Sequence, residues 1–336
     1  MTGQQAMPSA SSTPETAVLL DVRDLTVAFR TSRGTIRAAN GVSFAVARGH
    51  TLGLVGESGS GKSVTLRAVI GLVPPPGQIL RGEVRFDGRD LVQAPREVLQ
   101  GVRGRDIGMI FQDPMGGLTP VLSVGSQLTE VLRVKSGLSS RAAASRAEEL
   151  LHRVGIRSAH DRLRAYPHQL SGGMAQRIMI ALAIAANPRL LLADEPTTAL
   201  DVSVQDQVLS LLEDLRLEFD MGMLIVSHDL GVIARACDEV AVIYAGHVLE
   251  SGSVTEVLRH SRHPYTRMLL ATIPSLRTSG VREPLVTIAG QLPELAGLPP
   301  GCPFAPRCGF ARTECAAIPV VLDASSRAHG SACPFV

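Results

Sequence analysis

Gly56-Glu-Ser-Gly-Ser-Gly-Lys-Ser63 is the stretch that decides the fold of this 336-residue chain. It matches the pattern Gly-x-x-x-x-Gly-Lys-Ser/Thr of a phosphate-binding loop. A short apolar run at 51–55 precedes it, as a buried strand would, and residues 64–72 follow it with apolar side chains at helical spacing. The glycines let backbone N–H groups turn towards an anion, and the helix N-terminus adds partial positive charge. The sequence therefore predicts that the chain binds a nucleoside triphosphate.

Two acidic residues at the end of a second apolar run complete the chemistry that a triphosphate requires. Lys62 can reach the β- and γ-phosphates, and the Ser63 hydroxyl can ligate Mg²⁺. The run 190–193 is followed directly by Asp194 and Glu195. Asp194 suits the magnesium site, and Glu195 can orient or deprotonate the attacking water. Alone, such a run more often indicates a buried strand with a charged end, but its place after a phosphate-binding loop favours the catalytic interpretation.

The composition indicates a globular chain with no general affinity for nucleic acid. Hydrophobic residues make up 45% of it, enough for a core, and the formal net charge is only +2. Aromatic residues are 3% with no tryptophan, which leaves few surfaces on which bases could stack. No apolar run reaches the roughly 20 residues of a membrane span. Residues 1–16 are expected to form a disordered tail, without the basic start or apolar centre of a signal peptide. We expect a cytoplasmic chain that other subunits hold at a membrane.

The hydrophobic pattern predicts an α/β core that carries a small antiparallel sheet. Runs at 19–30 and 41–46, with a turn at 47–49, indicate antiparallel strands, and a further strand is expected at 82–88. Buried strands of the core are expected at 107–111, 190–193, 223–226, 240–244 and 246–252. Strands separated by helical stretches favour a parallel sheet with crossover helices.

Composition divides the chain further. Residues at about 113–186 have a helical composition and predict a helical subdomain. Proline and glycine become frequent after 262, and four of the five cysteines lie between 302 and 333. We therefore expect a nucleotide-binding domain at 17–262 and a cysteine-rich extension at 263–336.

A second set of motifs follows the phosphate-binding loop. Leu170-Ser-Gly-Gly-Met174 opens a helical stretch about 110 residues after the loop and about 20 before the two acids. Ser followed by glycines suits an ordinary N-cap, yet exposed N–H groups at a helix start also bind phosphate. Together with Phe111-Gln-Asp-Pro114, Ala199-Leu-Asp201 and Ser227-His-Asp229, this pattern resembles the ATP-binding-cassette ATPases over residues 18–262.

The resemblance implies an ATP site shared by two cassettes that pack head to tail. One loop and one signature motif per chain then require a partner cassette. The residues assigned to ATP are Phe29 (on adenine), Gly56, Glu57, Ser58, Gly59, Ser60, Gly61, Lys62, Ser63 and Val64. The implied catalytic set is Lys62, Gln112, Glu195 and His228, and Mg²⁺ is implied at Ser63, Gln112 and Asp194. The signature that acts on the partner's ATP comprises Leu170, Ser171, Gly172, Gly173 and Met174, and Asp201 belongs to the D-loop.

Five stretches are similar to one branch of that family, the oligopeptide and dipeptide importers. They are residues 111–115, residues 166–174, residues 194–202, His263-Pro-Tyr-Thr266 and Gly301-Cys-Pro-Phe304. The branch usually has Met-Thr-Ser-Leu-Asn-Pro after the glutamine motif and Arg after the signature. This chain has Met115-Gly-Gly-Leu-Thr-Pro120 and Ala175 instead. These departures affect the expected coupling to the permease and leave the expectation of ATP binding unchanged.

The branch implies an ATP-hydrolysing subunit that powers import of dipeptides or oligopeptides. Its implied partners are a second, non-identical cassette subunit, two integral-membrane permease subunits and an extracytoplasmic peptide-binding protein, with the chain peripheral on the cytoplasmic face of the membrane. Nickel or another small solute remains an alternative cargo, since a cassette does not touch the cargo. A cassette acting on nucleic acid or ribosomes is a further alternative. It predicts tandem cassettes or a coiled-coil insertion and a basic face, none of which the sequence contains.

The clustered cysteines predict a metal site. Cys302, Cys308, Cys315 and Cys333 lie among Pro, Gly and Arg residues, and four thiols in a cytosolic chain suit zinc or an iron–sulfur cluster better than disulfides. The resemblance to the importer branch favours [4Fe–4S] over zinc, with free thiols as a further alternative. A regulatory interpretation, in which the thiols sense iron or redox state, rests on this cluster alone. Cys237 is expected to be a buried structural residue.

Overall fold

The computed structural model describes residues 18–32, 34–198, 200–273, 287–298, 300–322 and 329–336. The predicted tail at 1–16 lies outside these ranges. The strands are β1 (Val18–Thr31), β2 (Gly34–Ala47), β3 (Thr51–Val55), β4 (Gly77–Phe86), β5 (Arg89–Asp90), β6 (Ile107–Ile110), β7 (Leu190–Asp194), β8 (Gly222–Ser227), β9 (Glu239–Tyr244), β10 (His247–Ser253) and β11 (His329–Ser331). The α-helices are α1 (Lys62–Val69), α2 (Arg96–Val102), α3 (Val124–Ser136), α4 (Ser140–Arg153), α5 (Ala159–Arg162), α6 (Gly172–Ile184), α7 (Val202–Phe219), α8 (Leu230–Ala236), α9 (Val254–Arg259) and α10 (Pro264–Ala271). Short 3-10 helices are η1 (Pro167–Gln169), η2 (Ala305–Arg307) and η3 (Thr313–Ala316).

A seven-stranded sheet forms the centre of the molecule, in the order β11-β10-β9-β3-β8-β7-β6. The strands from β9 to β6 pair parallel to one another. β3, β7 and β8 are buried along their whole length, which is why their sequences are continuous apolar runs rather than alternating ones. Because parallel strands end at the same edge of a sheet, the loops that follow β3, β6, β7 and β8 gather there.

The smaller sheet is antiparallel, in the order β2-β1-β4-β5. Its first strands contain the predicted runs, but β2 begins earlier than the pattern indicates. Residues 34–40, for which the pattern predicts no strand, pair with β1 as the first half of β2. Most side chains at 34–37 are exposed, so the one charged residue, Arg37, is tolerated while the backbone completes the ladder.

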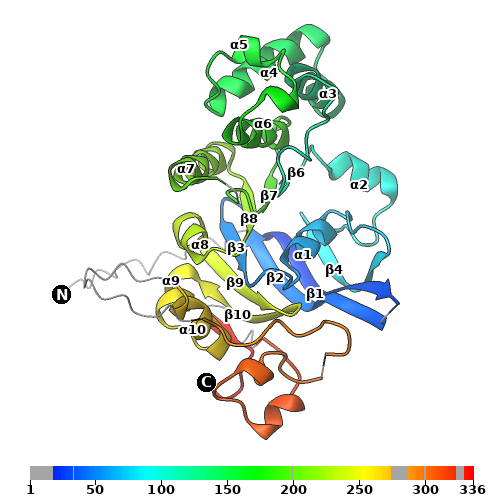
Figure 1. Ribbon diagram of the computed structural model, residues 1–336. Helices are drawn as coiled ribbons and strands as arrows, with labels where there is room; N and C mark the ends of the chain where they lie inside the picture. The colour runs from blue at the N-terminus through cyan, green and yellow to red at the C-terminus, as the bar shows by residue number, and fades with distance from the viewer. Residues whose placement is uncertain (1–17, 33, 199, 274–286, 299, 323–328) are drawn as a thin grey trace, which may run out of the picture.

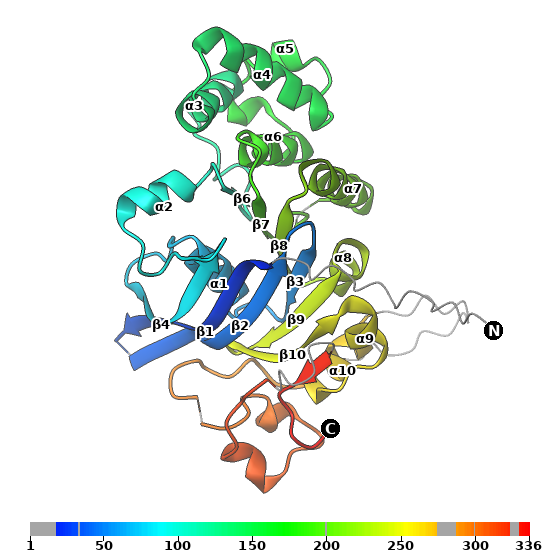
Figure 2. The same cartoon turned by 180° about the vertical axis from the view of Figure 1, so that it is seen from behind.

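The helical lobe packs around its own apolar residues at one end of the molecule (Figure 1 and Figure 2). It comprises α3 to α6, which bring together fully buried side chains such as Leu128, Leu150 and Ile178. Ser123 and Ser139 accept backbone N–H bonds at the starts of α3 and α4, as helix N-caps do. The same apolar cluster continues onto β7 and β8, so this lobe is joined to one face of the central sheet.

The C-terminal extension packs at the opposite end, against β9 and β10 (Figure 1). β11 adds to the edge of the central sheet by antiparallel pairing with β10. Tyr244 on β9, Tyr265 on α10 and Phe304 are fully buried, with ring centroids 4.6 to 5.3 Å apart. The sequence did not predict β11, because three residues are too few to show a periodic pattern. The predicted division of the chain at 262 stays a prediction.

The α/β class, the antiparallel sheet and the helical subdomain are all present in this structure. In the part of the chain that the structure describes, none of the helices combines the length and apolar character needed to cross a bilayer.

Candidate nucleotide-binding site

The phosphate-binding loop joins β3 to α1, and close backbone approaches require two of its glycines. A Cβ atom on Gly56 would lie 2.0 Å from the carbonyl oxygen of Ile243, and one on Gly61 would lie 1.9 Å from that of Ala38. Gly61 also has a φ of 101°, a region that residues with a Cβ rarely adopt. The loop is therefore held tightly between β2 and β9.

Lys62 begins α1 and extends its side chain across the inside of the loop. Its Nζ donates to the carbonyl oxygens of Gly56 at 2.7 Å and Glu57 at 2.9 Å. Lys62 is only 4% exposed. Burial lowers the pKa of its ammonium, and the neighbouring carboxylates of Glu195, Asp194 and Glu57 act in the opposite direction. The cation is thus held where the motif needs it for phosphates.

Ser63 and Asp194 come together as a candidate magnesium site. The Ser63 hydroxyl donates to Oδ1 of Asp194 at 2.7 Å. Asp194 is fully buried, and burial raises the pKa of its carboxyl against the opposing hydrogen bond from Ser63. Its Oδ2 has no hydrogen-bond donor among the described residues, although Arg67 lies 3.9 Å away. A buried oxygen without a donor, beside a hydroxyl, fits the oxygen ligands that Mg²⁺ takes in proteins.

The rest of the loop surrounds a buried hydroxyl. Ser58 and Gly59 form the exposed tip of the loop, and Ser60 is buried with its Oγ unpaired among the described residues. Val64 packs against the apolar cluster beneath the central sheet. The buried Ser60 hydroxyl and the Lys62 ammonium are therefore the polar groups enclosed by the loop.

Three side chains surround the carboxylate of Glu195. Its Oε2 accepts hydrogen bonds from Gln112 Nε2 at 3.1 Å and Thr198 Oγ1 at 2.8 Å, and lies 3.2 Å from His228 Nδ1. Burial by itself raises the pKa of Glu195, but the bonds from Thr198 and His228 outweigh it and lower that pKa. Glu195 has a φ of 48°, a strained backbone that such sites often carry. The group is an ionised carboxylate directly after Asp194.

Gln112 lies beside Glu195. Its amide Nε2 donates to Oε2 of Glu195 at 3.1 Å. It follows β6 at the carboxyl edge of the sheet, as His228 follows β8. Its implied role at Mg²⁺ stays a prediction.

The signature begins α6, on the helical lobe (Figure 1). Ser171 is the N-cap, and its Oγ accepts the N–H of Met174 at 3.3 Å. The ordinary N-cap interpretation is therefore correct as geometry. A Cβ added to Gly172 would meet no described atom within 4 Å, whereas one added to Gly173 would lie 3.4 Å from Val204. Leu170 precedes the cap and packs partly into the lobe. The predicted action on a partner's ATP stays a prediction.

The two remaining predicted residues occupy ordinary structural positions. Asp201 is the N-cap of α7, and its Oδ1 accepts the N–H of Val204 at 2.9 Å. Ala199, which begins the same motif, lies outside the described residues. Phe29 on β1 is half-buried, and its ring lies against Gly77 and Val73. Its contact with adenine stays a prediction.

Sequence reasoning missed three contacts of this site. Thr198 follows the two acids within the quoted stretch 194–202, so its closeness to Glu195 could have been expected from spacing alone. The hydroxyl of Tyr265 accepts the N–H of Glu57 at 3.0 Å, and Arg307 pairs with the carboxylate of Glu57 at 3.0 Å. No local pattern could have found these two, because they lie more than 200 residues from the loop in sequence.

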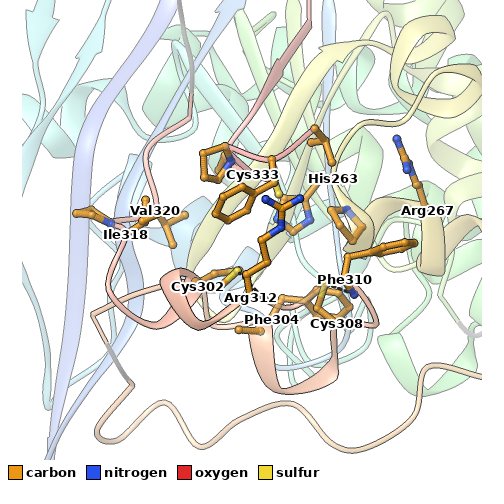
Figure 3. Close-up of a pocket in the computed structure, with 18 residues that line it drawn as sticks. His263, Arg267, Cys302, Phe304, Cys308, Phe310, Arg312, Ile318, Val320 and Cys333 are labelled. Carbon is orange, nitrogen blue, oxygen red and sulfur yellow. Dashed lines mark hydrogen bonds between the residues drawn. The ribbon is translucent and has the colours of Figure 1, made fainter.

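The four clustered cysteines line one pocket of about 250 Å³ in the extension (Figure 3). Backbone N–H groups of Phe310 and Arg312 donate to the sulfurs of Cys308 and Cys315 at 3.4 Å. Yet among the described residues, no three Cys, His, Asp or Glu side chains are grouped closely enough to hold a metal ion. The structure thus supports a gathering of thiols and gives no support to an iron–sulfur cluster.

Cys237 lies apart from this pocket, at the end of α8. It is partly buried, and burial raises the pKa of its thiol to about 12. Such a thiol stays protonated and inert, in line with the predicted structural role.

Comparison with known proteins identifies the family. The ABC transporter family model matches residues 39–198, and the model of the oligopeptide/dipeptide transporter C-terminal region matches residues 249–315. The chain is 51% identical over 294 residues to the oligopeptide transport ATP-binding protein OppD of Bacillus subtilis, covering 87% of this chain and 82% of that protein. The chain belongs to the ABC transporter family. It is an ATPase of that family.

Further relatives of this ABC ATPase have similar coverage. OppD of Haemophilus influenzae is 46% identical, over 90% of this chain and 92% of its own length. A putative peptide import ATP-binding protein of Brucella melitensis is 47% identical, over 95% and 96%.

Solved structures share the cassette fold. The dimeric cassette MJ0796 bound to ADP and phosphate has a TM-score of 0.64 at 28% identity, covering 70% of this chain and 98% of its own. The structure of cbiO1 from Clostridium perfringens, part of an ABC transporter complex, has a TM-score of 0.61 at 27% identity, covering 73% and 92%. These matches confirm the predicted ABC ATPase fold.

Proposed function

We propose that this ABC ATPase powers the import of oligopeptides or dipeptides. The observation that carries the proposal is the match of both parts of the chain: an ATPase core and the C-terminal region of oligopeptide/dipeptide transporters. Relatives at 46 to 51% identity are oligopeptide transport ATP-binding proteins. Nothing in the cassette itself contacts cargo, so the support for peptide comes from these relatives.

The proposed chemistry uses the side chains that the fold gathers at the carboxyl edge of the central sheet. Lys62 and the loop N–H groups bind the phosphates, and Ser63 with Asp194 holds Mg²⁺, which neutralises charge on the transferred phosphoryl group. Glu195, kept ionised by its neighbours, orients the attacking water and accepts its proton. His228 lies beside Glu195, where it can donate to a γ-phosphate oxygen.

A single chain is an incomplete ATP site in this proposal. The signature lies on the helical lobe, whereas the phosphate-binding loop lies against the central sheet (Figure 1). We therefore propose a second, non-identical cassette subunit whose signature completes the site. Two permease subunits and an extracytoplasmic peptide-binding protein would complete the transporter, with this chain on the cytoplasmic face of the membrane.

Uptake measurements in the source organism test the cargo. Cells from which the gene has been deleted should lose uptake of labelled tripeptides and tetrapeptides. The wild-type gene should restore uptake, and the Glu195→Gln variant should not, because it binds ATP without activating water. Nickel uptake serves as the parallel measurement. Loss of nickel uptake with normal peptide uptake would identify nickel, rather than peptide, as the cargo. No loss of either uptake would contradict a transport role.

For the extension, we propose that the four thiols around its pocket ligate a [4Fe–4S] cluster. The support is the chemistry of the donor set: Cys302, Cys308, Cys315 and Cys333 line one pocket, and backbone N–H groups donate to two of the sulfurs. Such bonds accompany thiolate ligands and tune cluster potentials. Burial raises the pKa of Cys302 and Cys308, so ligation would require loss of these protons. The thiols would also have to move closer together than they stand here.

Metal analysis of protein purified without oxygen tests the cluster. We expect about four irons and equal sulfide per chain, and loss of both in the Cys308→Ser variant. Cys237→Ser is the matched control, because this thiol lies outside the pocket and its loss should leave the iron content unchanged. Stoichiometric zinc without sulfide would favour the zinc alternative. Absence of both iron and zinc would contradict a metal site and favour free thiols.

A further inference from the structure

The C-terminal extension contacts the phosphate-binding loop directly through Arg307. One guanidinium nitrogen of Arg307 lies 3.0 Å from both carboxylate oxygens of Glu57. Glu57 is the second residue of the loop, 250 positions earlier in the chain. The Arg307 side chain is 7% exposed and that of Glu57 25%. An ion pair this sheltered is screened much less than one on the surface.

The rest of the Arg307 guanidinium is held by the extension and by β9. Its Nε donates to the carbonyl oxygen of Ala289 at 2.9 Å, and its second terminal nitrogen donates to that of Ile288 at 3.3 Å. The guanidinium also donates to the Tyr244 hydroxyl at 3.2 Å and lies over the Tyr244 ring, 5.7 Å from its centroid. The position of the charge is therefore set by the packing of the extension, not by the loop.

The extension holds the loop at two further points. Tyr265 on α10 accepts the backbone N–H of Glu57 at 3.0 Å, so this N–H faces the extension. Leu292 lies 3.5 Å from the position that a side chain on Gly59 would occupy. Contacts from three separate stretches of the extension thus converge on one side of the loop.

Charge explains what the Arg307 contact does for ATP. Glu57 lies next to the Lys62 ammonium, which donates to the Glu57 carbonyl oxygen at 2.9 Å, and the negative charge of its carboxylate acts to raise the pKa of Lys62. An unpaired Glu57 would compete with ATP phosphates for that ammonium and would repel the phosphates themselves. Arg307 offsets the negative charge and keeps the carboxylate turned towards the extension. Lys62 is then left for the nucleotide.

We propose that Arg307 is a positioning residue for the nucleotide site, through which the extension sets the affinity of the loop for ATP. Arg307 ends η2 and directly precedes Cys308. A rearrangement of the thiol pocket would therefore move the Arg307 side chain and change its contact with the phosphate-binding loop. By linkage, ATP bound at the loop stabilises this docked arrangement of the extension to the same degree. The inference concerns ATP binding and does not depend on which cargo is transported.

A double-mutant cycle in the full chain tests the proposal, with ATP affinity measured by calorimetry in the presence of Mg²⁺. Arg307→Met keeps an apolar stem over Tyr244 but removes the charge. It should weaken ATP binding about tenfold in the wild-type background, because the Glu57 carboxylate loses its partner. In the Glu57→Gln background the same change should cost less than about twofold, because no charge remains to be offset.

Two further variants separate charge from packing. Arg307→Lys keeps the charge and loses the planar fork, so we expect ATP affinity between those of the wild type and Arg307→Met. Arg259→Met is the control: Arg259 is an exposed arginine at the end of α9 and lies outside the thiol pocket, so its loss should leave ATP affinity unchanged. Thermal unfolding checks that each variant is folded.

The proposal is overturned by either of two results. Equal losses of ATP affinity from Arg307→Met in both backgrounds would show that Arg307 acts only through packing. Unchanged ATP affinity in Arg307→Met would show that the ion pair has no effect on the nucleotide. If Arg307→Met does not fold, Arg307→Gln in the two backgrounds decides the same question, because it removes the charge and keeps a hydrogen-bond donor. A loss of ATP affinity that Glu57→Gln fails to reduce would contradict a charge effect.

Discussion

Glu195 shows how neighbouring side chains determine the charge of a buried carboxylate. Burial opposes ionisation, yet Thr198 and His228 reverse that effect and lower the pKa of Glu195. A carboxylate that accepts hydrogen bonds in its charged form is stabilised in that form. Asp194, one position earlier, has a single donor among the described residues and a raised pKa. Burial acts on both acids. It raises the pKa of Asp194 because the hydrogen bond from Ser63 and the nearby cations do not offset it, whereas at Glu195 the hydrogen bonds and nearby cations outweigh it.

Replacement of Thr198 tests the role of its hydrogen bond. In Thr198→Val the carboxylate loses one donor, so the pKa of Glu195 should rise. ATPase activity needs the ionised form, which exists above that pKa, so the acid limb of the pH–rate profile should move to higher pH. The loss of orientation should lower kcat by about tenfold, near the worth of one hydrogen bond to a charged group. The measurement is kcat against pH in the assembled transporter.

Thr198→Ser is the matched control for that measurement. It keeps the hydroxyl that donates to Glu195, so the acid limb should stay at its wild-type position. An unchanged acid limb in Thr198→Val would mean that Thr198 does not control the protonation that limits activity.

At the scale of elements, the backbone of neighbouring strands packs closely against the phosphate-binding loop that joins β3 to α1. The apolar strand ends at Val55, and the chain turns at once past β9, where the carbonyl of Ile243 faces Gly56. The turn points the start of α1 into the loop. The phosphate site is therefore defined by strand spacing as much as by the motif.

Gly56→Ala tests this element-scale constraint. A Cβ 2.0 Å from the Ile243 oxygen must displace β3 or β9, so we expect a loss of about 2–4 kcal/mol in the free energy of unfolding together with loss of ATP binding. Gly101→Ala on α2 is the control. Its added methyl meets no described atom within 4 Å, and a helical Gly→Ala change should stabilise by about 0.5–1 kcal/mol. Urea unfolding measures both. Equal stability of the two variants would contradict the steric argument.

At the scale of the whole molecule, two distant parts of the chain lie on either side of the nucleotide site. The helical lobe and the extension lie at opposite ends of the central sheet (Figure 2). The extension contacts the loop through Glu57, and the lobe carries the signature. Loop and signature therefore occupy different parts of one chain. This separation fits the proposed pairing, in which each cassette holds ATP on its own loop and offers its signature to the other.

Much of the fold could be predicted because it depends on local patterns. The core strands β7 and β8 are short apolar runs, and α3 to α6 all lie within the predicted helical stretch at about 113–186. The first half of β2 was missed because its first residues, Gly34 to Arg37, are mostly exposed and form no apolar run. β11 was missed because its strand character comes from pairing with β10 rather than from its own residues.

The candidate site likewise combines residues that the sequence motifs predict with contacts that only the fold creates. Lys62, Ser63, Asp194 and Glu195 belong to motifs whose spacing already specifies their chemistry, and the fold brings them together. No local pattern predicts the contact between Gln112 and Glu195, because the amide reaches across the sheet edge to the residue that follows β7. The gathering of four cysteines was expected, and their positions here do not form a metal site.

The sequence by itself determined the phosphate-binding loop, the acids that follow β7 and the family, because each is encoded in short runs of residues whose spacing the backbone preserves. The tertiary structure alone decided which remote side chains act on those residues. Arg307 reaches Glu57 across 250 positions and Gln112 reaches Glu195 across 83. Such contacts depend on how buried strands and the aromatic cluster of the extension pack, and packing brings together residues that no local pattern relates.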